Sequence, residues 1–215
     1  FPFVFTFLVN EHHFKANEPE ILLRRLAPNC RVLSVPSTTQ GAACTALLAA
    51  DALQLQRPLL IANSDQWVDF SIDDFIEESL QTNCDGNILT FKACEEKWSY
   101  AKADSLGFVE EVAEKKPISD QATVGIYFFR KAKQFVEAAQ QMIRKEIRTR
   151  NEFYLCPVYN ELIQNLGRVR ISEIPSRAMH GLGTPEDLDA FLRFHLRYAP
   201  SCDRLPAFEP QLDPN

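Results

Sequence analysis

Glycine is scarce in this chain, with seven residues in 215, about half of the usual ~7%. Neither a GxGxxG nor a GxxxxGK[ST] pattern occurs. These loops bind phosphate through closely approaching backbone N–H groups. Any phosphate chemistry in this chain must therefore proceed without a glycine-rich loop of its own.

Three further absences exclude other classes of protein. No apolar run approaches the ~18 residues that a membrane span requires, and no two of the six cysteines have CxxC spacing. A disulfide framework and a zinc site are therefore not expected. The net charge of −6 lacks the basic excess of a nucleic-acid-binding protein. We expect a cytoplasmic protein with no membrane span and no nucleic-acid partner.

The remaining composition, 46% hydrophobic and 24% charged residues, is typical of a globular domain. Apolar segments at Phe1–Val9, Arg31–Val35 and Pro58–Ala62 are predicted to be buried strands, and helical patterns alternate with them over the first 80 residues. This alternation predicts a mainly parallel sheet flanked by helices. The middle of the chain is richer in strands, which favours an added antiparallel part.

The sequence contains no clear domain linker. We expect one domain over residues 1–198, followed by a proline-rich tail over residues 199–215.

Two strand ends carry polar residues that suit a ligand site. The apolar run PLLIA is followed at once by Asn63, Ser64, Asp65 and Gln66. A carboxylate at Asp65 would hold Mg²⁺ together with substrate phosphates, or it would cap a turn. After the second strand, Thr38 to Gly41 precede a helix, and they would either approach a flat ring or an anion or form an ordinary helix N-cap.

Two later clusters are less specific. The run AEKKP places Glu114 beside Lys115 and Lys116, which would meet hydroxyls and a phosphate or form a solvated turn. The run HGLGTPEDL contains Thr184, Pro185 and Asp187, a favourable helix start.

In their order along the chain, these clusters resemble the sugar-phosphate nucleotidyltransferase family, and most of all its surface-polysaccharide biosynthesis branch. The resemblance extends over residues 3–192 and rests on TTQGAACTALLA, PLLIANSDQ, GFVEEVAEKKPIS, ATVGIYFF, NEFYLCPVYNELI and GLGTPEDL.

The resemblance implies a Rossmann-like, glycosyltransferase-A-like α/β fold. It also implies a Mg²⁺-dependent enzyme that joins a sugar phosphate to a nucleoside triphosphate and releases pyrophosphate. The nucleotide would be bound by Thr39, Gln40, Gly41, Ala42, Asn63 and Asp65, with Gln40, Gly41 and Ala42 at the base and Asp65 as the metal ligand.

On the sugar side, the resemblance assigns Glu114 and Lys115 to the sugar phosphate. It places Gly125 in the lining of the sugar pocket and Glu152 at the sugar hydroxyls. Asp65 and Lys115 would be the catalytic residues, because positioning, Mg²⁺ and a cation perform most of a phosphoryl transfer.

Two departures from the family pattern matter. The family opens with a central strand and a glycine-rich loop around the triphosphate, whereas this chain begins at the expected second strand. We expect either a preceding segment in the parent protein or another repair of the sheet, and poor turnover by these 215 residues alone. Gly181 also stands where many members carry a second metal-binding aspartate.

Two other functions remain open at this stage. A domain without the triphosphate loop would be an inactive nucleotide-sugar-binding or regulatory module. A glycosyltransferase of related fold would use the NSD run as its acidic motif. For the enzyme, the expected partners are a nucleoside triphosphate and a sugar phosphate, with a homo-oligomer also possible.

Overall fold

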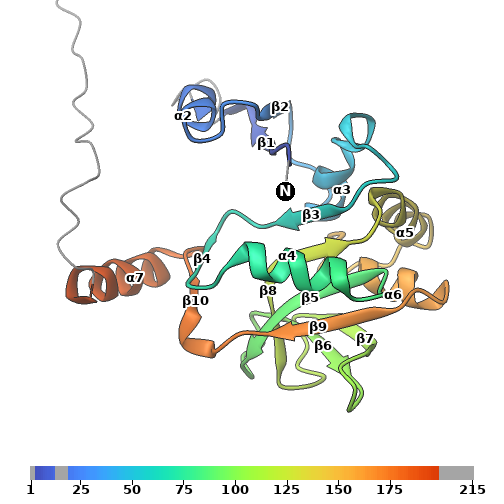
Figure 1. Ribbon diagram of the computed structural model, residues 1–215. Coiled ribbons are helices and arrows are strands. Elements are labelled where there is room, and N and C mark those ends of the chain that lie inside the picture. The colour runs from blue at the N-terminus through green and yellow to red at the C-terminus, as the bar shows by residue number, and fades with distance from the viewer. Residues whose placement is uncertain (1–2, 13–18, 199–215) are drawn as a thin grey trace, which may run out of the picture.

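The structure, a computed structural model, describes residues 3–12 and 19–198 (Figure 1). Its centre is a six-stranded sheet in the order β7–β6–β8–β5–β9, with β3 also paired to β8. These strands are β3 (Leu59–Ala62), β5 (Gly86–Lys92), β6 (Ser99–Ala103), β7 (Val109–Glu114), β8 (Gln121–Phe129) and β9 (Val169–Glu173). The proline-rich tail predicted for residues 199–215 lies outside the described residues.

The mixed α/β fold predicted from the sequence is confirmed, with a correction to its mainly parallel pairing. Among the described residues, the parallel pairs are β5 with β9 and β1 (Thr6–Asn10) with β2 (Arg31–Val35). The other pairs are antiparallel: β8 runs against β3, β5 and β6, and β6 runs against β7. An unbroken apolar run shows that a strand is covered on both faces, but it does not give the direction of its neighbours.

Helices cover both faces of the sheet. On one face lie α3 (Ala42–Leu47), α5 (Ala132–Arg144) and α6 (Val158–Gln164), whose apolar side chains join one core cluster. Phe135, Ala139 and Met142, which follow helical spacing in the sequence, are buried there. On the other face, α4 (Ile72–Gln81) buries Phe75 in a second cluster.

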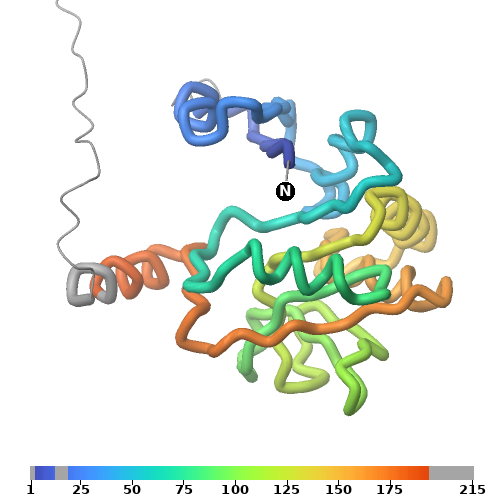
Figure 2. Tube along the Cα trace, in the orientation of Figure 1, coloured from blue at the N-terminus to red at the C-terminus, as the bar shows by residue number. Residues whose placement is uncertain are grey.

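A small N-terminal unit stands apart from this body (Figure 2). It contains β1, β2 and α2 (Pro19–Leu26), and β1 and β2 form a separate two-stranded sheet. The predicted buried strand at Phe1–Val9 is corrected here. The strand begins only at Thr6, its residues are half-buried, and Phe3, Val4 and Phe5 are exposed. The aliphatic and aromatic residues of this segment predicted a strand. Whether the strand is buried depends on the elements that pack against it.

A short antiparallel pair joins β4 (Gln66–Val68) to β10 (Met179–Gly181), which lies far along the chain. Helix α7 (Pro185–Tyr198) begins directly after it and projects from the body (Figure 1). Connecting turns form the short helices Ala50–Ala52 and Ser176–Ala178. None of the described helices is long and apolar enough to cross a membrane.

Candidate functional site

The site is built around a division on one edge of β8. Residues 126–129 of that edge pair with β3, whereas Ala122 pairs with Tyr100 of β6. The two partner strands part at Gly125, whose φ of +88° is left-handed. A Cβ atom at Gly125 would lie 2.7 Å from the Nδ2 atom of Asn63. Glycine thus allows Asn63 to sit against the strand where the sheet divides.

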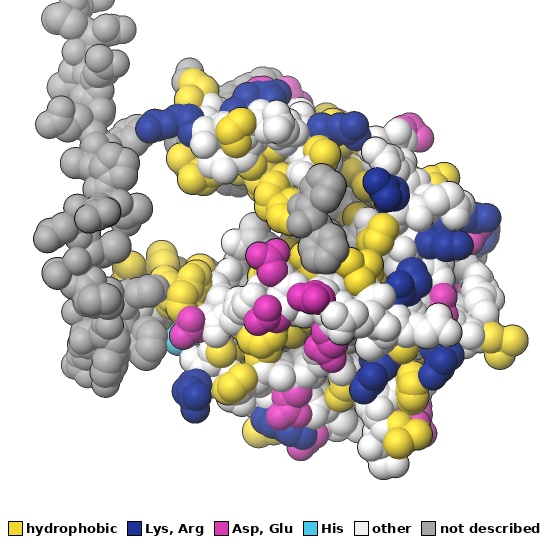
Figure 3. Space-filling model, in the orientation of Figure 1, with side chains coloured by type: hydrophobic (Ala, Val, Ile, Leu, Met, Phe, Trp, Pro, Cys, Tyr) yellow, Lys and Arg dark blue, Asp and Glu magenta, His cyan; other side chains and the backbone are white. Residues whose placement is uncertain are grey.

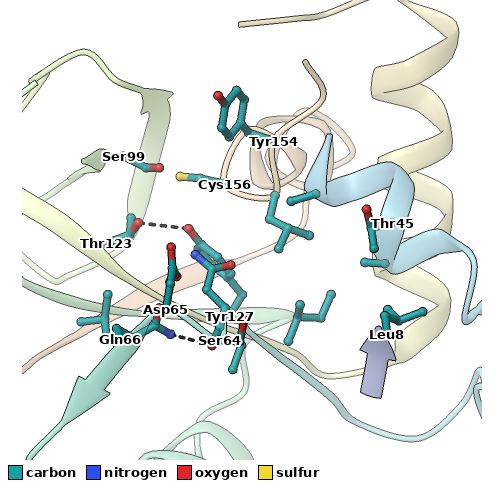
Figure 4. Close-up of a pocket in the computed structure, with 18 of the residues that line it drawn as sticks. Leu8, Thr45, Ser64, Asp65, Gln66, Ser99, Thr123, Tyr127, Tyr154 and Cys156 are labelled. Atoms are coloured by element: carbon teal, nitrogen blue, oxygen red, sulfur yellow. Dashed lines mark hydrogen bonds between the residues drawn. The ribbon is translucent and has the colours of Figure 1, made fainter. Parts of the chain in front are cut away.

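A cavity of about 1190 Å³ opens at this division. It collects residues from segments far apart in the sequence (Figure 4). Of the residues predicted for the site, it brings together Ala42, Asn63, Asp65, Glu114, Lys115 and Gly125. Its lining does not include Thr39, Gln40, Gly41 or Glu152.

Asp65 lies in the turn between β3 and β4. Its backbone carbonyl accepts a hydrogen bond from the Leu182 N–H at 2.7 Å, which ties the turn to the strand that precedes α7. A Cβ atom on Gly183 would lie 3.1 Å from Asp65 Oδ2, so the absence of a side chain at Gly183 leaves room for the carboxylate. The sequence signal, polar residues directly after an apolar strand, therefore located a real cavity edge.

Glu114 is the last residue of β7 and Lys115 follows it, and both line the cavity. The Ser99 hydroxyl donates a hydrogen bond to the Glu114 carboxylate, while burial raises the pKa of that carboxyl above its usual value. Lys115 has a positive φ of 54°, which is uncommon for a residue with a side chain. Its Nζ atom donates a hydrogen bond to Tyr154 Oη at 2.9 Å, and its N–H bonds to the Trp98 carbonyl at 3.1 Å.

A wall of uncharged polar groups completes this end of the cavity. Ser99, Thr123, Tyr127 and Cys156 point toward one another in Figure 4. The Thr123 and Tyr127 hydroxyls form a hydrogen bond of 3.0 Å. Burial raises the pKa values of Tyr127 and Cys156 well above their usual values, so both groups are neutral at pH 7. The site thus offers hydroxyl groups suited to the hydroxyls of a sugar.

Sequence reasoning missed this wall and also Tyr154, Lys97, Trp98 and Asp187, which line the cavity too. Ser99 belongs to β6, whereas Thr123 and Tyr127 belong to β8, and only strand pairing brings the three together. Asp187 was assigned to the start of a helix, which is correct, since α7 begins at Pro185. Its carboxylate also lies 3.4 Å from Lys97 Nζ.

The residues before α3 have clear packing contacts. A Cβ atom at Gly41, whose φ is +123°, would lie 2.5 Å from the Phe153 carbonyl oxygen. The Gln40 backbone carbonyl accepts a hydrogen bond from the Phe153 N–H at 2.8 Å. The side-chain oxygen of Gln40 accepts another from Arg148. The Thr39 and Thr45 hydroxyls are 2.6 Å apart. Contacts of Thr39, Gln40 and Gly41 with a nucleobase stay a prediction.

Glu152 is exposed, next to a turn in which Thr149 and Glu152 exchange backbone hydrogen bonds. Its charge contributes to the raised pKa of Glu114, so the two carboxylates lie within electrostatic range. A contact between Glu152 and sugar hydroxyls stays a prediction.

Within residues 3–12 and 19–198, no group of three or more His, Cys, Asp or Glu side chains is arranged to hold a metal. Mg²⁺ in phosphate chemistry commonly uses one or two protein carboxylates, with water and substrate phosphates as the other ligands. The single carboxylate of Asp65 at the cavity edge fits that mode of binding. A metal held by protein side chains alone does not fit these residues.

The described residues form a Rossmann-like α/β domain whose fold is similar to that of three solved structures. The crystal structure of a nucleoside-diphosphate-sugar pyrophosphorylase from Vibrio cholerae RC9 superposes with a TM-score of 0.78 and 26% sequence identity. The match covers 89% of this chain and 81% of that one. No known family's sequence model matches the chain, and no curated protein is similar enough to match.

Two more distant structures share the fold. One is named a candidate glucose-1-phosphate thymidylyltransferase from Bacillus anthracis, solved with a sucrose. It has 16% sequence identity and a TM-score of 0.70, and the match covers 88% of this chain and 74% of that one. The other is the inositol-1-phosphate CTP transferase from T. maritima, with 13% identity, a TM-score of 0.66, and coverage of 90% and 76%. The resemblance to sugar-phosphate nucleotidyltransferases inferred from the sequence is thereby confirmed.

Proposed function

We propose that this protein transfers a nucleotidyl group from a nucleoside triphosphate to a sugar phosphate and releases pyrophosphate. One observation supports this function above the others. Asp65 at a strand end and the Glu114–Lys115 pair, which lie far apart in the sequence, line a single cavity. That cavity belongs to a fold shared with a nucleoside-diphosphate-sugar pyrophosphorylase over 89% of the chain.

The reaction requires positioning more than side-chain chemistry. A phosphate oxygen of the sugar phosphate attacks the α-phosphorus of the triphosphate, and the bond from that phosphorus to the bridging oxygen breaks. The bonding electrons leave with pyrophosphate. The attacking oxygen is already anionic, so no side chain must remove a proton from it. Lys115 orients the sugar phosphate and offsets charge in the transition state.

We propose Mg²⁺ as the metal, with Asp65 as its protein ligand and the triphosphate oxygens as further ligands. When bound, Mg²⁺ neutralises charge that develops on the phosphates. The contribution of the chain is to hold the Asp65 turn in place through the Leu182 N–H and to leave space at Gly183.

We propose that the wall formed by Ser99, Thr123, Tyr127 and Cys156 receives the sugar ring. Neutral hydroxyls donate and accept hydrogen bonds, so they match sugar hydroxyls better than charged groups would. Glu114, held by Ser99, supplies an acceptor on the same wall. The resemblance to the surface-polysaccharide branch supports a product used as a polysaccharide precursor in the cytoplasm. A homo-oligomer stays a prediction.

A panel of nucleoside triphosphates with sugar 1-phosphates and Mg²⁺ tests this function, using the polypeptide made from the natural gene. We expect one pair of substrates to release pyrophosphate, and this release to stop when the metal is chelated. No pyrophosphate with any pair would contradict the proposal, provided that circular dichroism shows a folded protein.

A second candidate is a nucleotide-sugar-binding module without turnover. It is favoured by one observation: in the part of the chain that the structure describes, the cavity is lined by two cations, Lys97 and Lys115, against the carboxylates of Asp65, Glu114 and Asp187. A triphosphate is polyanionic and binds poorly to an acidic surface. Tight binding of a nucleotide sugar with no pyrophosphate release would favour this module.

A further inference from the structure

The turn that follows α5 has an unusual backbone. Glu146, Arg150 and Asn151 in this turn have positive φ values of 53°, 47° and 65°. Only two other non-glycine residues of the described chain share this conformation. Residues with side chains disfavour it, so the contacts around the turn must hold the backbone in place.

Arg148 supplies such contacts from the middle of the turn. Its Nε atom donates a hydrogen bond to the Glu146 carboxylate at 2.6 Å, and its Nη1 atom donates one to the Asn151 carbonyl at 3.1 Å. The guanidinium carbon also lies 3.9 Å from the centre of the Phe153 ring. Two of the three residues with positive φ are therefore tied to one side chain.

The same guanidinium reaches a second segment, 108 positions earlier in the chain, where its Nη2 atom donates a hydrogen bond to Gln40 Oε1 at 2.7 Å. Backbone bonds join the same two segments. The Phe153 N–H donates to the Gln40 carbonyl at 2.8 Å, and the Ala43 N–H donates to the Phe153 carbonyl at 2.9 Å. The rigid, planar fork of arginine suits several acceptors at once. Arg148 thus fastens the turn to the start of α3.

Both of these segments continue into the lining of the cavity. Ala42 and Thr45 of α3 line it, and so does Tyr154, which follows the turn and accepts the hydrogen bond from Lys115 (Figure 4). Figure 3 shows the surface hollowed between the N-terminal unit and the body, where this cavity lies. Arg148 itself is not part of the described lining. It therefore joins two walls of the cavity without belonging to either.

The turn also carries charges that reach the sugar side of the site. Burial is the largest influence on the pKa of Glu114, but the charge of Arg150 lowers this pKa and the charge of Glu152 raises it. Both side chains thus lie within electrostatic range of the Glu114 carboxyl. A displacement of the turn changes the charges around Glu114, and Arg148 links any such displacement to α3.

We propose that Arg148 is a positioning residue that couples the two walls, so that a nucleotide bound against α3 tightens the binding of a sugar phosphate at Lys115 and Tyr154. This inference rests on the proposed function. A nucleotide against α3 orders the segment around Gln40, and the Arg148 bridge orders the turn with it. The sugar phosphate then binds to a wall that is already ordered. The coupling is reciprocal, so the sugar phosphate tightens nucleotide binding by the same factor.

Hydrogen exchange measured by mass spectrometry tests the bridge without any ligand. Arg148→Lys keeps the charge, but one ammonium group cannot replace the three hydrogen bonds of the guanidinium. In the natural polypeptide, amides of residues 40–46 and 149–155 should both exchange about tenfold faster in this variant, while those of β9 stay unchanged. Arg144→Lys makes the same change at the exposed end of α5 and should alter neither segment. Unchanged exchange in either segment, or equally faster exchange in β9, would overturn the proposal.

A matched pair of variants tests the coupling between ligands. Gln40→Met removes the acceptor for Arg148, whereas Gln40→Glu keeps one. Isothermal titration calorimetry measures the binding of glucose, galactose and mannose 1-phosphates in the presence of Mg²⁺. Each titration is made with and without saturating α,β-methylene analogues of the nucleoside triphosphates, from which no nucleotidyl group can be transferred. The analogue should tighten sugar-phosphate binding at least about fivefold in the wild type and in Gln40→Glu, and not in Gln40→Met or Arg148→Lys.

The outcomes separate this proposal from the proposed function. Equal tightening in all four proteins, or no tightening in a wild type that binds both ligands, would overturn the coupling. If the wild type binds none of these ligands, the proposed function fails, and the coupling of ligands fails with it. The exchange measurement still decides whether Arg148 joins the two segments.

Discussion

Lys115 and Tyr154 meet in the lining of the cavity, where the lysine Nζ atom donates a hydrogen bond to the tyrosine Oη atom at 2.9 Å. The same ammonium lies 4.8 Å from the centre of the Tyr154 ring. Lys115 has an uncommon positive φ, and residues held in sparsely populated backbone conformations cluster at functional sites. We therefore propose that Tyr154 is a positioning residue, which holds Lys115 where that cation would meet a phosphate.

Tyr154→Phe should raise the KM for the sugar phosphate about tenfold, because a hydrogen bond to a charged group is worth about 1.5 kcal/mol. The ring and its contact with the cation are retained, so the thermal midpoint of unfolding should change little. Steady-state kinetics of the natural polypeptide checks the prediction. Lys116→Gln, which alters the exposed neighbour, is the control and should leave KM unchanged. An unchanged KM in Tyr154→Phe would show that the hydroxyl does not position Lys115.

Asp65→Asn should weaken the binding of a nucleoside triphosphate with Mg²⁺ at least about tenfold, since the amide oxygen is a poorer ligand for a hard cation than a carboxylate. The substitution conserves shape, so the new side chain still fits the space that Gly183 leaves open. Isothermal titration calorimetry with and without Mg²⁺ measures the effect. Asp69→Asn removes a nearby exposed carboxylate outside the cavity and should have no effect. Equal binding by the wild-type protein and Asp65→Asn would remove Asp65 from the metal site.

Gly41→Ala and Gly107→Ala form a matched pair, because both glycines have positive φ. At Gly107 the nearest atom to an added Cβ is 3.6 Å away, whereas at Gly41 it is the Phe153 backbone at 2.5 Å. Gly107→Ala should therefore cost about 1 kcal/mol of unfolding free energy, and Gly41→Ala roughly 3 kcal/mol or more. Urea denaturation measures both values. If Gly41→Ala weakens nucleotide binding without extra destabilisation, Gly41 contacts the base rather than the packed turn.

The raised pKa of Glu114 predicts a pH dependence of stability. Burial is the largest cause, and it disfavours the ionised carboxylate in the folded state. The contribution of this group to folding is therefore fully present below its ordinary pKa near 4.5, and it is lost as pH rises through the higher folded pKa. Glu114→Gln cannot ionise and should not show this loss.

The measurement is the unfolding free energy of both proteins by urea titration at several pH values. The wild type should lose stability relative to Glu114→Gln as pH rises above about 4.5. A constant difference across that range would show that burial does not perturb Glu114.

The parts of the site that follow from local patterns were predictable. Asp65 follows an apolar strand, and Glu114 and Lys115 follow a strand into a charged turn, so each leaves a signal within a few residues. Their convergence was implied only through the family resemblance, and the structure confirms that both segments line one cavity. Gly125 also lines that cavity. Its positive φ and its lack of a side chain suit the point where β3 and β6 part.

The other site residues, and the direction of β8, depend on pairing between strands far apart in the sequence, which local sequence patterns do not indicate. Thr123 and Tyr127 lie four residues apart on β8, and their importance arises only when β7 and the segment around Cys156 come close. Glu114 likewise gains its environment from Ser99, fifteen positions earlier. The direction of β8 was unpredictable for a similar reason, since its apolar residues are covered on both faces whichever way it runs.

The most direct test of the central claim is cleavage of nucleotide sugars by inorganic pyrophosphate, the proposed reaction in reverse. The natural polypeptide, with Mg²⁺, is given a panel of nucleotide sugars, and ³¹P NMR follows the products with and without pyrophosphate. The account predicts that one nucleotide sugar yields a nucleoside triphosphate and a sugar phosphate in equal amounts, only when pyrophosphate is present, and far more slowly in Asp65→Asn. Release of a nucleoside diphosphate independent of pyrophosphate, or binding without any cleavage, would contradict it.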